Sequence, residues 1–446
     1  MFQECRAVSS FAQRSFWSFR HSGAIGRVLI PAGQRYASST CRTLGQDRPA
    51  AEPMADRPVV LDVAAPDDSL EALLGKNVRL HAKLQTMQWP PLSFFVANRC
   101  RYTLPWNPHG QSATCSPSST AELQYLAGLF DGDGSCVMDR GTLYIQVAQT
   151  FDAAAGLLRF QSAFGGGIYR KGDGLGLHKP MLYWRVAGCN ARQAAQYLAR
   201  HSIVKRKQLE LGVNLSQRPS RMPPLLQELK TLKRCDSAVE SSCTWEYVAG
   251  FFDAEGSIHQ IGKAALKLSI AQKFGTVLTC LCKFVNSEMG VHLSVTACRN
   301  QGSQKLNIHT TSICKDVLRN MLNAGLLRKA RPARLALDLS PDNAEQTRAA
   351  LYETTGNQQF LKRLDGDGHQ RARRIINAQN AARRAAQRGQ LEERLATLRQ
   401  VEELKANHVL EKARLENSRL HEYISGVQHL QQDGLPALPM LDQVAL

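Results

Sequence analysis

Long apolar runs, paired cysteines and acidic residues are all scarce in this sequence. No apolar run approaches the 18 residues that a membrane-spanning helix needs, so we expect no membrane segment. None of the 12 cysteines forms a C-x-x-C pair, which argues against a zinc site or a disulfide framework, and we interpret them as buried small side chains in a reducing compartment. Only 38 Asp and Glu oppose 56 Lys and Arg, a net charge of +18. This excess favours a polyanionic partner, nucleic acid before an acidic membrane surface.

Residues 1–46 have the composition of a transit peptide. They contain six arginines, no lysine and a single acidic residue, Glu4, and they lack the continuous apolar region of a secretory signal. The stretch QRYASS (34–39) resembles a mitochondrial processing site. We therefore expect import into an organelle, the mitochondrion before the chloroplast, with a disordered tail as the alternative. Without this segment the chain still carries a net charge of +13.

Two stretches of the chain repeat each other. YLAGLFDGDGS (125–135) corresponds to YVAGFFDAEGS (247–257) at an offset of 122 residues. QVAQTF (146–151) corresponds to SIAQKF (269–274), and IVKRK (203–207) to LLRKA (326–330), both at an offset of 123. Three landmarks in one order indicate an internal duplication. We divide the chain into a targeting segment (1–46), a poorly structured extension (47–118), a first half (119–213), a linker (214–242), a second half (243–338) and a charged helical tail (339–446).

Each half has the pattern helix, two strands, helix, two strands, helix, which predicts an α+β fold. In the first repeated motif, Ala127 and Gly128 interrupt an apolar helix face, as Ala249 and Gly250 do in the second. Such small residues allow another backbone to approach, so we expect the two helices to pack together. We expect each helix to end at its acidic residues, with Gly134 and Gly256 in a left-handed cap conformation.

Paired helix ends of this kind would bring carboxylates together. Negative charge at the negative end of two helix dipoles is unfavourable alone, and becomes favourable when divalent cations lie between the carboxylates. Carboxylates and backbone carbonyls are ligands suited to Mg²⁺. The repeated motif therefore predicts a metal site at the junction of the two halves.

Both motifs resemble the LAGLIDADG motif of homing endonucleases and of the related intron maturases, and the resemblance covers about residues 119–338. It implies two αββαββα halves whose motif helices form the central interface and whose antiparallel sheets form a saddle over the DNA major groove. It also implies that Asp133 and Glu255 bind the metal, aided by the backbone carbonyls of Gly132 and Ala254. The earlier acidic residues, Asp131 and Asp253, match structural positions.

The resemblance assigns further residues to catalysis. Gln149 and Gln272 match a position that orders active-site water, and Lys205 matches a basic residue that steadies the nucleophilic water or the developing charge. Its counterpart in the second half is Arg328 or Lys329, and the alignment leaves both open. The family motif also has a basic residue soon after the glutamine. Nothing here clearly matches it, since only Lys273 is available, and in this the sequence departs from the motif.

Basic and aromatic residues on the expected strands are possible groove contacts, and some of them are expected to be merely solvated. They are Tyr144, Tyr169, Arg170, Lys171, Tyr183, Arg185, Lys273, Arg299 and Lys305. In the tail, we interpret RLDGDGHQ (363–370) as a turn between helices and not as a third active site. The arginine-rich stretch 369–388 has either a solvated face or a phosphate-binding one. Apolar residues at helical spacing from Leu391 to Leu404 predict an amphipathic helix that docks back on the protein or pairs weakly, and not a coiled coil.

Together these features predict a monomeric, Mg²⁺-dependent, site-specific endonuclease of double-stranded DNA that leaves short 3′ overhangs. The alternative is an organellar maturase that binds intron RNA without required cleavage. Retention of Asp133 and Glu255 favours the endonuclease, because a protein that only binds RNA needs neither carboxylate.

Overall fold

The computed structural model describes residues 69–108, 119–139, 141–214, 222–298, 302–354 and 364–433. The expected targeting segment, residues 1–46, and the predicted contact Arg299 lie outside these described residues.

The first half has the predicted order of elements. They are α2 (Thr120–Asp133), β3 (Gly134–Asp139), β4 (Thr142–Thr150), α3 (Ala155–Phe164), β5 (Gly167–Gly172), β6 (Met181–Ala187) and α4 (Gly188–Ala199). The strands form an antiparallel sheet in the order β3-β4-β6-β5. Side chains along β4 alternate between buried and partly exposed, as period-2 patterning requires. The buried face of the sheet packs against α3 and α4, where Trp184 stacks on Phe160.

The second half repeats this architecture. Its elements are α7 (Trp245–Glu255), β7 (Gly256–Ile261), β8 (Ala265–Gln272), α8 (Thr276–Met289), β9 (Val295–Ala297), β10 (Gln304–Ile308) and α9 (Thr311–Asn323). Its antiparallel sheet has the order β7-β8-β10-β9, equivalent to that of the first half. The predicted α+β class and the duplicated αββαββα order are therefore confirmed. A further helix follows each half, α5 (Arg206–Val213) and α10 (Ala330–Leu337), and α6 (Met222–Leu232) lies in the linker.

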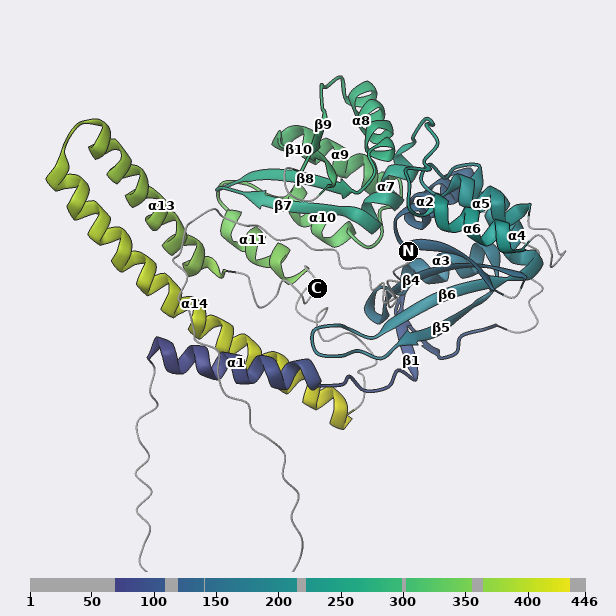
Figure 1. Ribbon diagram of the computed structural model, residues 1–446, viewed down its shortest axis with the longest axis horizontal. Helices are drawn as coiled ribbons and strands as arrows, with labels where there is room; N and C mark the ends of the chain where they lie inside the picture. Colours follow the sequence, from purple (N-terminus) through teal and green to yellow (C-terminus); the bar gives the residue numbers. More distant parts are fainter. Residues whose placement is uncertain are drawn as a thin grey trace, which may run out of the picture. The chain divides into compact units, whose positions relative to one another are not determined.

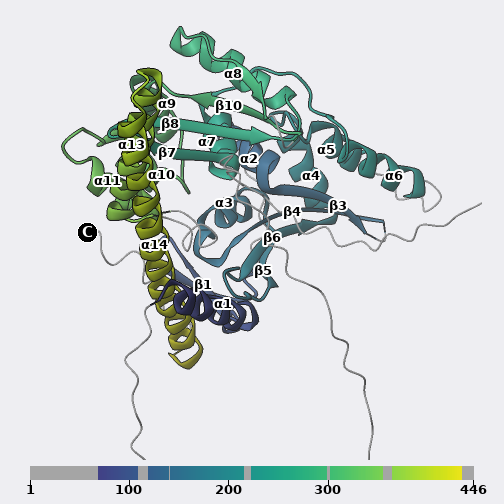
Figure 2. The same ribbon diagram turned by 60° about the vertical axis from the view of Figure 1, so that its left-hand side comes forward.

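The two halves meet through α2 and α7, which pack side by side between the sheets (Figures 1 and 2). A Cβ atom on Gly128 would lie 2.2 Å from the backbone oxygen of Tyr247, and one on Gly250 would lie 2.0 Å from that of Tyr125. Only glycine permits this approach, because real Cβ contacts are never so short. The small-residue prediction is confirmed, and the two glycines hold equivalent places in the two helices.

The predicted left-handed caps at the ends of these helices are wrong. Gly134 has φ −81° and Gly256 has φ −72°, both extended, and each residue begins a strand directly. Glycine is required here for space: an added Cβ would lie 2.1 Å from the Phe130 ring at Gly134, and 2.2 Å from the Phe252 ring at Gly256. Each helix therefore passes into its strand without a turn.

The expected lack of structure in the extension 47–118 is wrong for residues 69–108. Ser69 caps the N-terminus of helix α1 (Leu70–Thr86), because its side chain accepts a hydrogen bond from the backbone N–H of Ala72. Strand β1 (Phe94–Ala97) pairs with β2 (Cys100–Thr103). The helix packs along α14 (Leu391–Asp433), more than 300 residues later in the chain. The buried amide of Asn77 donates to the Ala413 carbonyl at 2.9 Å. A local propensity argument could not find this partner.

The tail is helical, as predicted. It contains α11 (Ala344–Glu353), α13 (Gly366–Gln387) and α14, and α13 and α14 form an antiparallel hairpin (Figure 1). The second DGDG sequence is not only a turn: Asp365 caps the N-terminus of α13 by accepting from Gly368 N–H, and the residues from Gly366 onward are helical. None of the helices in the described residues is both long and apolar enough to cross a bilayer.

The described cysteines carry no disulfide, and their burial is mixed. Five of the nine are buried, at positions 136, 243, 280, 282 and 314. Cys100, Cys189 and Cys235 are exposed, so the prediction that the cysteines are buried is wrong for these three.

Candidate active site at the paired helix ends

The first acidic residue of each motif anchors the chain that returns to it from the end of its own half. The Asp131 carboxylate, 3% exposed, accepts hydrogen bonds from the backbone N–H groups of Ile203, Val204 and Lys205 at 2.7–3.0 Å. It also accepts from the Ser202 hydroxyl at 2.5 Å. These donors lie at the start of α5, so Asp131 fixes that segment against the end of α2. The structural role predicted for it agrees with this geometry.

Asp253 has the same function in the second half. Its fully buried carboxylate accepts from the backbone N–H groups of Leu327, Arg328 and Lys329 at 2.7–3.1 Å. The two sets of donors align at an offset of 124, so the sequence alignment at 123 is wrong by one residue in this segment. Lys329, and not Arg328, is the counterpart of Lys205.

A tyrosine from the opposite helix donates a further hydrogen bond to each of these buried carboxylates. Tyr125 of α2 donates to Asp253 at 2.7 Å, and Tyr247 of α7 donates to Asp131 at 2.6 Å. Burial, and next the adjacent carboxylate, raise the pKa of each tyrosine well above 10, so both stay protonated donors. These reciprocal hydrogen bonds link α2 to α7, so each helix helps to satisfy the buried carboxylate of the other.

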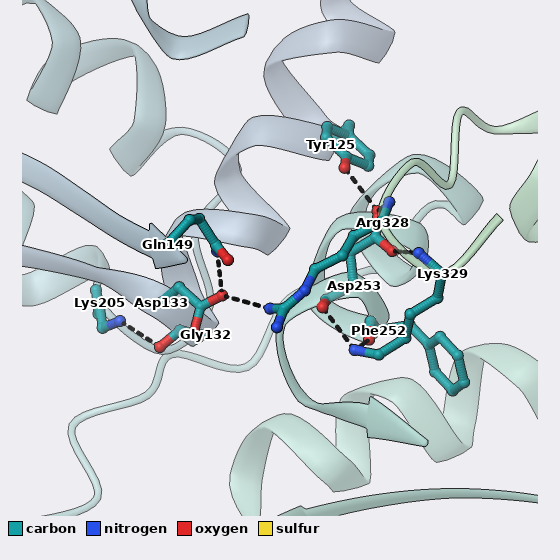
Figure 3. A network of polar contacts seen from close by, with 9 residues as sticks. All are labelled: Tyr125, Gly132, Asp133, Gln149, Lys205, Phe252, Asp253, Arg328 and Lys329. Atoms are coloured by element: carbon teal, nitrogen blue, oxygen red, sulfur yellow. Dashed lines mark hydrogen bonds and ion pairs between the residues drawn. The ribbon is translucent and has the colours of Figure 1, made fainter. Parts of the chain in front are cut away.

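Asp133 lies at the end of α2 beside one of the predicted glutamines. The Gln149 amide, at the end of β4, donates to the Asp133 carboxylate at 2.6 Å (Figure 3). Gln149 is buried, whereas the Asp133 side chain is 27% exposed. The amide therefore orients a carboxylate that remains open to solvent.

Glu255 lies at the end of α7, close to Asp133. Burial, and next the charge of Asp133, raise the pKa of Glu255, while a hydrogen bond from Gln272 acts in the opposite direction. A Cβ on Gly132 would lie 2.2 Å from the Ala254 Cβ and 3.3 Å from the Glu255 Cγ, so the two motif ends are in direct contact. The predicted pair of carboxylates, each with its own glutamine, is thus brought together.

Two lysines lie beneath this pair. The Lys205 ammonium donates to the carbonyls of Phe130 at 2.8 Å and Gly132 at 3.1 Å. The Lys329 ammonium donates to the Phe252 carbonyl at 2.6 Å and the Asp253 carbonyl at 2.5 Å (Figure 3). Each lysine thereby neutralises the carbonyl end of its motif helix. Burial lowers the pKa of both, that of Lys329 to about 7 with a further contribution from Arg328.

Arg328 breaks the symmetry of the site. Its guanidinium lies 3.8 Å from the Asp133 carboxylate across the interface, and both side chains are partly exposed (Figure 3). The equivalent residue of the first half is Val204, which cannot reach Glu255 with a charge. The half that supplies Asp133 therefore receives a cation from its neighbour, and the half that supplies Glu255 does not.

The site offers oxygen ligands in a form that a divalent cation can use. Asp133 and Glu255 repel each other, and Asp133 is accessible. The described residues contain no cluster of three or more His, Cys, Asp or Glu side chains, so two carboxylates, backbone carbonyls and water would make up the ligand set. The Gly132 carbonyl already accepts from Lys205, so a cation there would share it with the ammonium group.

Comparison with known proteins gives one kind of match. No protein-family profile and no curated protein matches the chain. The structural similarity is to LAGLIDADG homing endonucleases. The I-SmaMI LAGLIDADG homing endonuclease bound to cleaved DNA is 14% identical, with a TM-score of 0.39 over 52% of this chain and 96% of that one. The LAGLIDADG meganuclease I-AabMI bound to uncleaved DNA is 17% identical, with a TM-score of 0.38 over 51% of this chain and 97% of that one.

Four predicted contact residues of the first half lie on the sheet face that α3 and α4 leave uncovered: Tyr144, Tyr169, Tyr183 and Arg185. Tyr144 lies under the Arg185 guanidinium, 3.5 Å from ring centroid to Cζ, and Tyr169 packs against Tyr183 across β5 and β6. Nε of Arg185 is buried without a hydrogen-bond partner. This face therefore presents three aromatic rings and one cation that is incompletely satisfied.

Two of the predicted contacts fall elsewhere. Arg170 pairs across the sheet with the buried Leu182, so it lies on the other face, where it forms an ion pair with Asp173 at 3.5 Å. Lys273 lies beyond the end of β8, over the Phe274 ring. Lys171, near the end of β5, is exposed.

The open face of the second sheet is basic, and sequence reasoning found only part of it. Lys305 of β10 was predicted, whereas His259 and Lys267, opposite each other on β7 and β8, were missed. Burial, and next the neighbouring lysine charges, lower the pKa of both His259 and Lys267. The signal was alternation: Lys267 stands between the buried Leu266 and Leu268 in the strand.

Proposed function

We propose that this protein is a divalent-cation-dependent endonuclease that cleaves double-stranded DNA with one carboxylate from each half. The observation that carries the proposal is the contact between the ends of α2 and α7. It places Asp133 and Glu255, each with its own glutamine, at a pseudo-twofold axis between two open polar sheets. A duplex also has two strands related by local twofold symmetry, so one acidic group per half matches one cut per strand.

The chain's own residues would divide the work. Gln149 and Gln272 orient the carboxylates and leave their outer oxygens free for a cation and water. A bound Mg²⁺ would activate water and stabilise charge on the scissile phosphate and the leaving 3′ oxygen. Lys205, and Lys329 when it is protonated, add positive charge beneath the reacting phosphates, and Arg328 adds a partly exposed cation on the Asp133 side only.

The two sheets supply the binding surface. Aromatic side chains and Arg185 on the first sheet and lysines on the second would face the same kind of ligand, a negatively charged duplex with readable base edges. Because the two faces differ in sequence, we infer a monomer that binds an asymmetric target.

The experiment is cleavage of a randomised duplex library by the full chain in Mg²⁺. The control carries Asp133→Asn and Glu255→Gln, which keep the side-chain shape and remove the charge. Cuts with short 3′ overhangs, absent from the control and from EDTA reactions, are the expected result. No cutting, with equal binding of structured intron RNA by both proteins, would overturn the endonuclease in favour of an RNA-binding scaffold.

A further inference from the structure

Helix α13 concentrates positive charge outside the two halves. It contains five arginines and a single carboxylate, Asp367, whereas its neighbour α14 has eight acidic residues against six basic ones. Near the N-terminus of α13, Arg371 lies 3.8 Å from Asp365. For Arg373, Arg374 and Arg384 the described residues provide no acidic partner. Ion pairs with α14 therefore do not neutralise the charge of α13 within the described residues.

The packing of α13 determines where this charge points. Gly368, Ala382 and Ala385 are its buried residues, and they face α14. The opposite face carries Arg373, Asn377, Asn380 and Arg384, all exposed. Arg374 and Arg383 are exposed on the two flanks, and Arg374 borders a hollow that Leu404 and Glu411 of α14 also line. Gly389, with φ +72°, ends the helix and lets α14 return along it. The hairpin thus leaves the face of Arg373 and Arg384 pointing away from α14.

The arrangement of the arginines on α13 fits a duplex. Arg373 and Arg384 are eleven residues apart, about three turns, so they point the same way, and Asn377 and Asn380 lie between them on this face. Arg374 and Arg383 are nine residues apart, about two and a half turns, so they lie on opposite flanks of the helix. A helix that lies along the B-DNA major groove has one phosphate backbone on each side, so each flank arginine would reach one backbone. Arg373 and Arg384 are long enough to reach a phosphate, and the two amides between them can bond to base edges.

We propose that the exposed side of α13 is a second DNA-binding surface, a helix that lies in the major groove of a duplex with arginines on both of its flanks reaching the two backbones. It shares the ligand class of the proposed endonuclease but none of its active-site residues. It would add affinity outside the segment that is cut.

Duplex DNA fits this face better than duplex RNA does. The major groove of an A-form helix is deep and narrow, and side chains on a helix cannot enter it. Single-stranded RNA is bound by aromatic stacking in most proteins, and the exposed face of α13 has no aromatic residue. The only large apolar side chain on this face is Ile376, which is 54% exposed. It lies between Arg374 and Arg383 along the chain, where a thymine methyl group can contact it.

The test measures binding of a labelled 60-base-pair duplex of random sequence to the full chain in EDTA. All proteins also carry Asp133→Asn and Glu255→Gln, so cleavage plays no part. One variant changes Arg373, Arg374, Arg383 and Arg384 to Gln, which keeps helix propensity. The matched control changes Arg394, Arg399, Lys405 and Lys412 of α14 to Gln, removing the same charge from exposed positions of the same hairpin. Circular dichroism checks that both fold.

We expect the α13 variant to lose at least about tenfold in affinity, and its slope of log K against log salt to fall by about 3–4, because each phosphate contact contributes about 0.9. The control should change that slope by less than about 1. Equal slopes in the two variants would overturn the proposal. So would a loss confined to a stem-loop RNA probe, which would assign α13 to RNA. Either result leaves the library cleavage test of the active site unaffected.

Discussion

The two halves of the molecule agree in the residues that hold the fold and differ in the exposed residues around the candidate site. Asp131 and Asp253 each accept three backbone N–H groups and one tyrosine from the opposite helix. Gly128 and Gly250 make the same backbone approach. In contrast, Val204 corresponds to the charged Arg328, and an aromatic sheet face corresponds to a lysine-bearing one. The two halves therefore keep the same interface geometry and differ in the exposed residues around it.

The largest expected effect tests the equivalence of the interface. Gly128→Ala and Gly250→Ala should each cost more than about 3 kcal/mol of stability, because the new Cβ meets backbone that cannot yield. Gly75→Ala is the control, since α1 has open space around that position. It should be neutral or stabilise by up to about 1 kcal/mol. Urea unfolding checks all three, and tolerance of either interface substitution would contradict the backbone packing.

Much of this interface could be predicted from the sequence. The repeat places two apolar helices with Ala-Gly steps at equal positions, and close packing follows from glycine itself. The choice between Arg328 and Lys329 could not be made, because it depends on backbone N–H groups converging on Asp253 and not on residue type. Helix α1 was missed because it is stabilised by packing against α14, far along the chain. Lys267 was missed although it alternates with Leu266 and Leu268; its place opposite His259 depends on the register of β7 and β8, which no local pattern gives.

The next largest effect concerns the buried carboxylates. Asp131→Asn and Asp253→Asn should each destabilise by about 3–5 kcal/mol, because an amide turns a donor toward backbone N–H groups. Asp131 should cost more, since the Ser202 hydroxyl gives it a fifth donor where the equivalent residue is Leu326. The exposed Asp316 is the control, and its Asn variant should stay within about 0.5 kcal/mol. A larger loss at Asp253 would reverse this comparison.

A pH effect distinguishes the buried lysine of the second half. The pKa of Lys329 is lowered to about 7, so above pH 7 the folded chain holds it neutral while the unfolded chain remains protonated up to its usual value near 10.4. Unfolding then takes up a proton, and stability rises with pH by up to about 1.4 kcal/mol per pH unit. Lys329→Met should remove this slope between pH 7 and 9 in urea titrations with EDTA. An unchanged slope would show that the lysine stays charged.

The smallest effect concerns the cation that only one half receives. With an identified target, Arg328→Gln should slow cleavage of one DNA strand about tenfold and leave the other near its original rate, because the guanidinium lies beside Asp133 alone. Val204→Gln, at the equivalent position, should affect neither strand. Strand-specific end labelling measures both rates. Equal slowing of the two strands would mean that Arg328 acts on the site as a whole.

The account depends most on Asp133 and Glu255 acting as one pair at the interface. Manganese binding to the full chain, followed by electron paramagnetic resonance of free Mn²⁺, tests this most directly and needs no target sequence. We predict that Asp133→Asn and Glu255→Gln each weaken binding at least about tenfold, and that the double variant binds little more weakly than either single one. Binding in the wild-type protein that neither substitution changes would contradict a shared metal site at the helix ends.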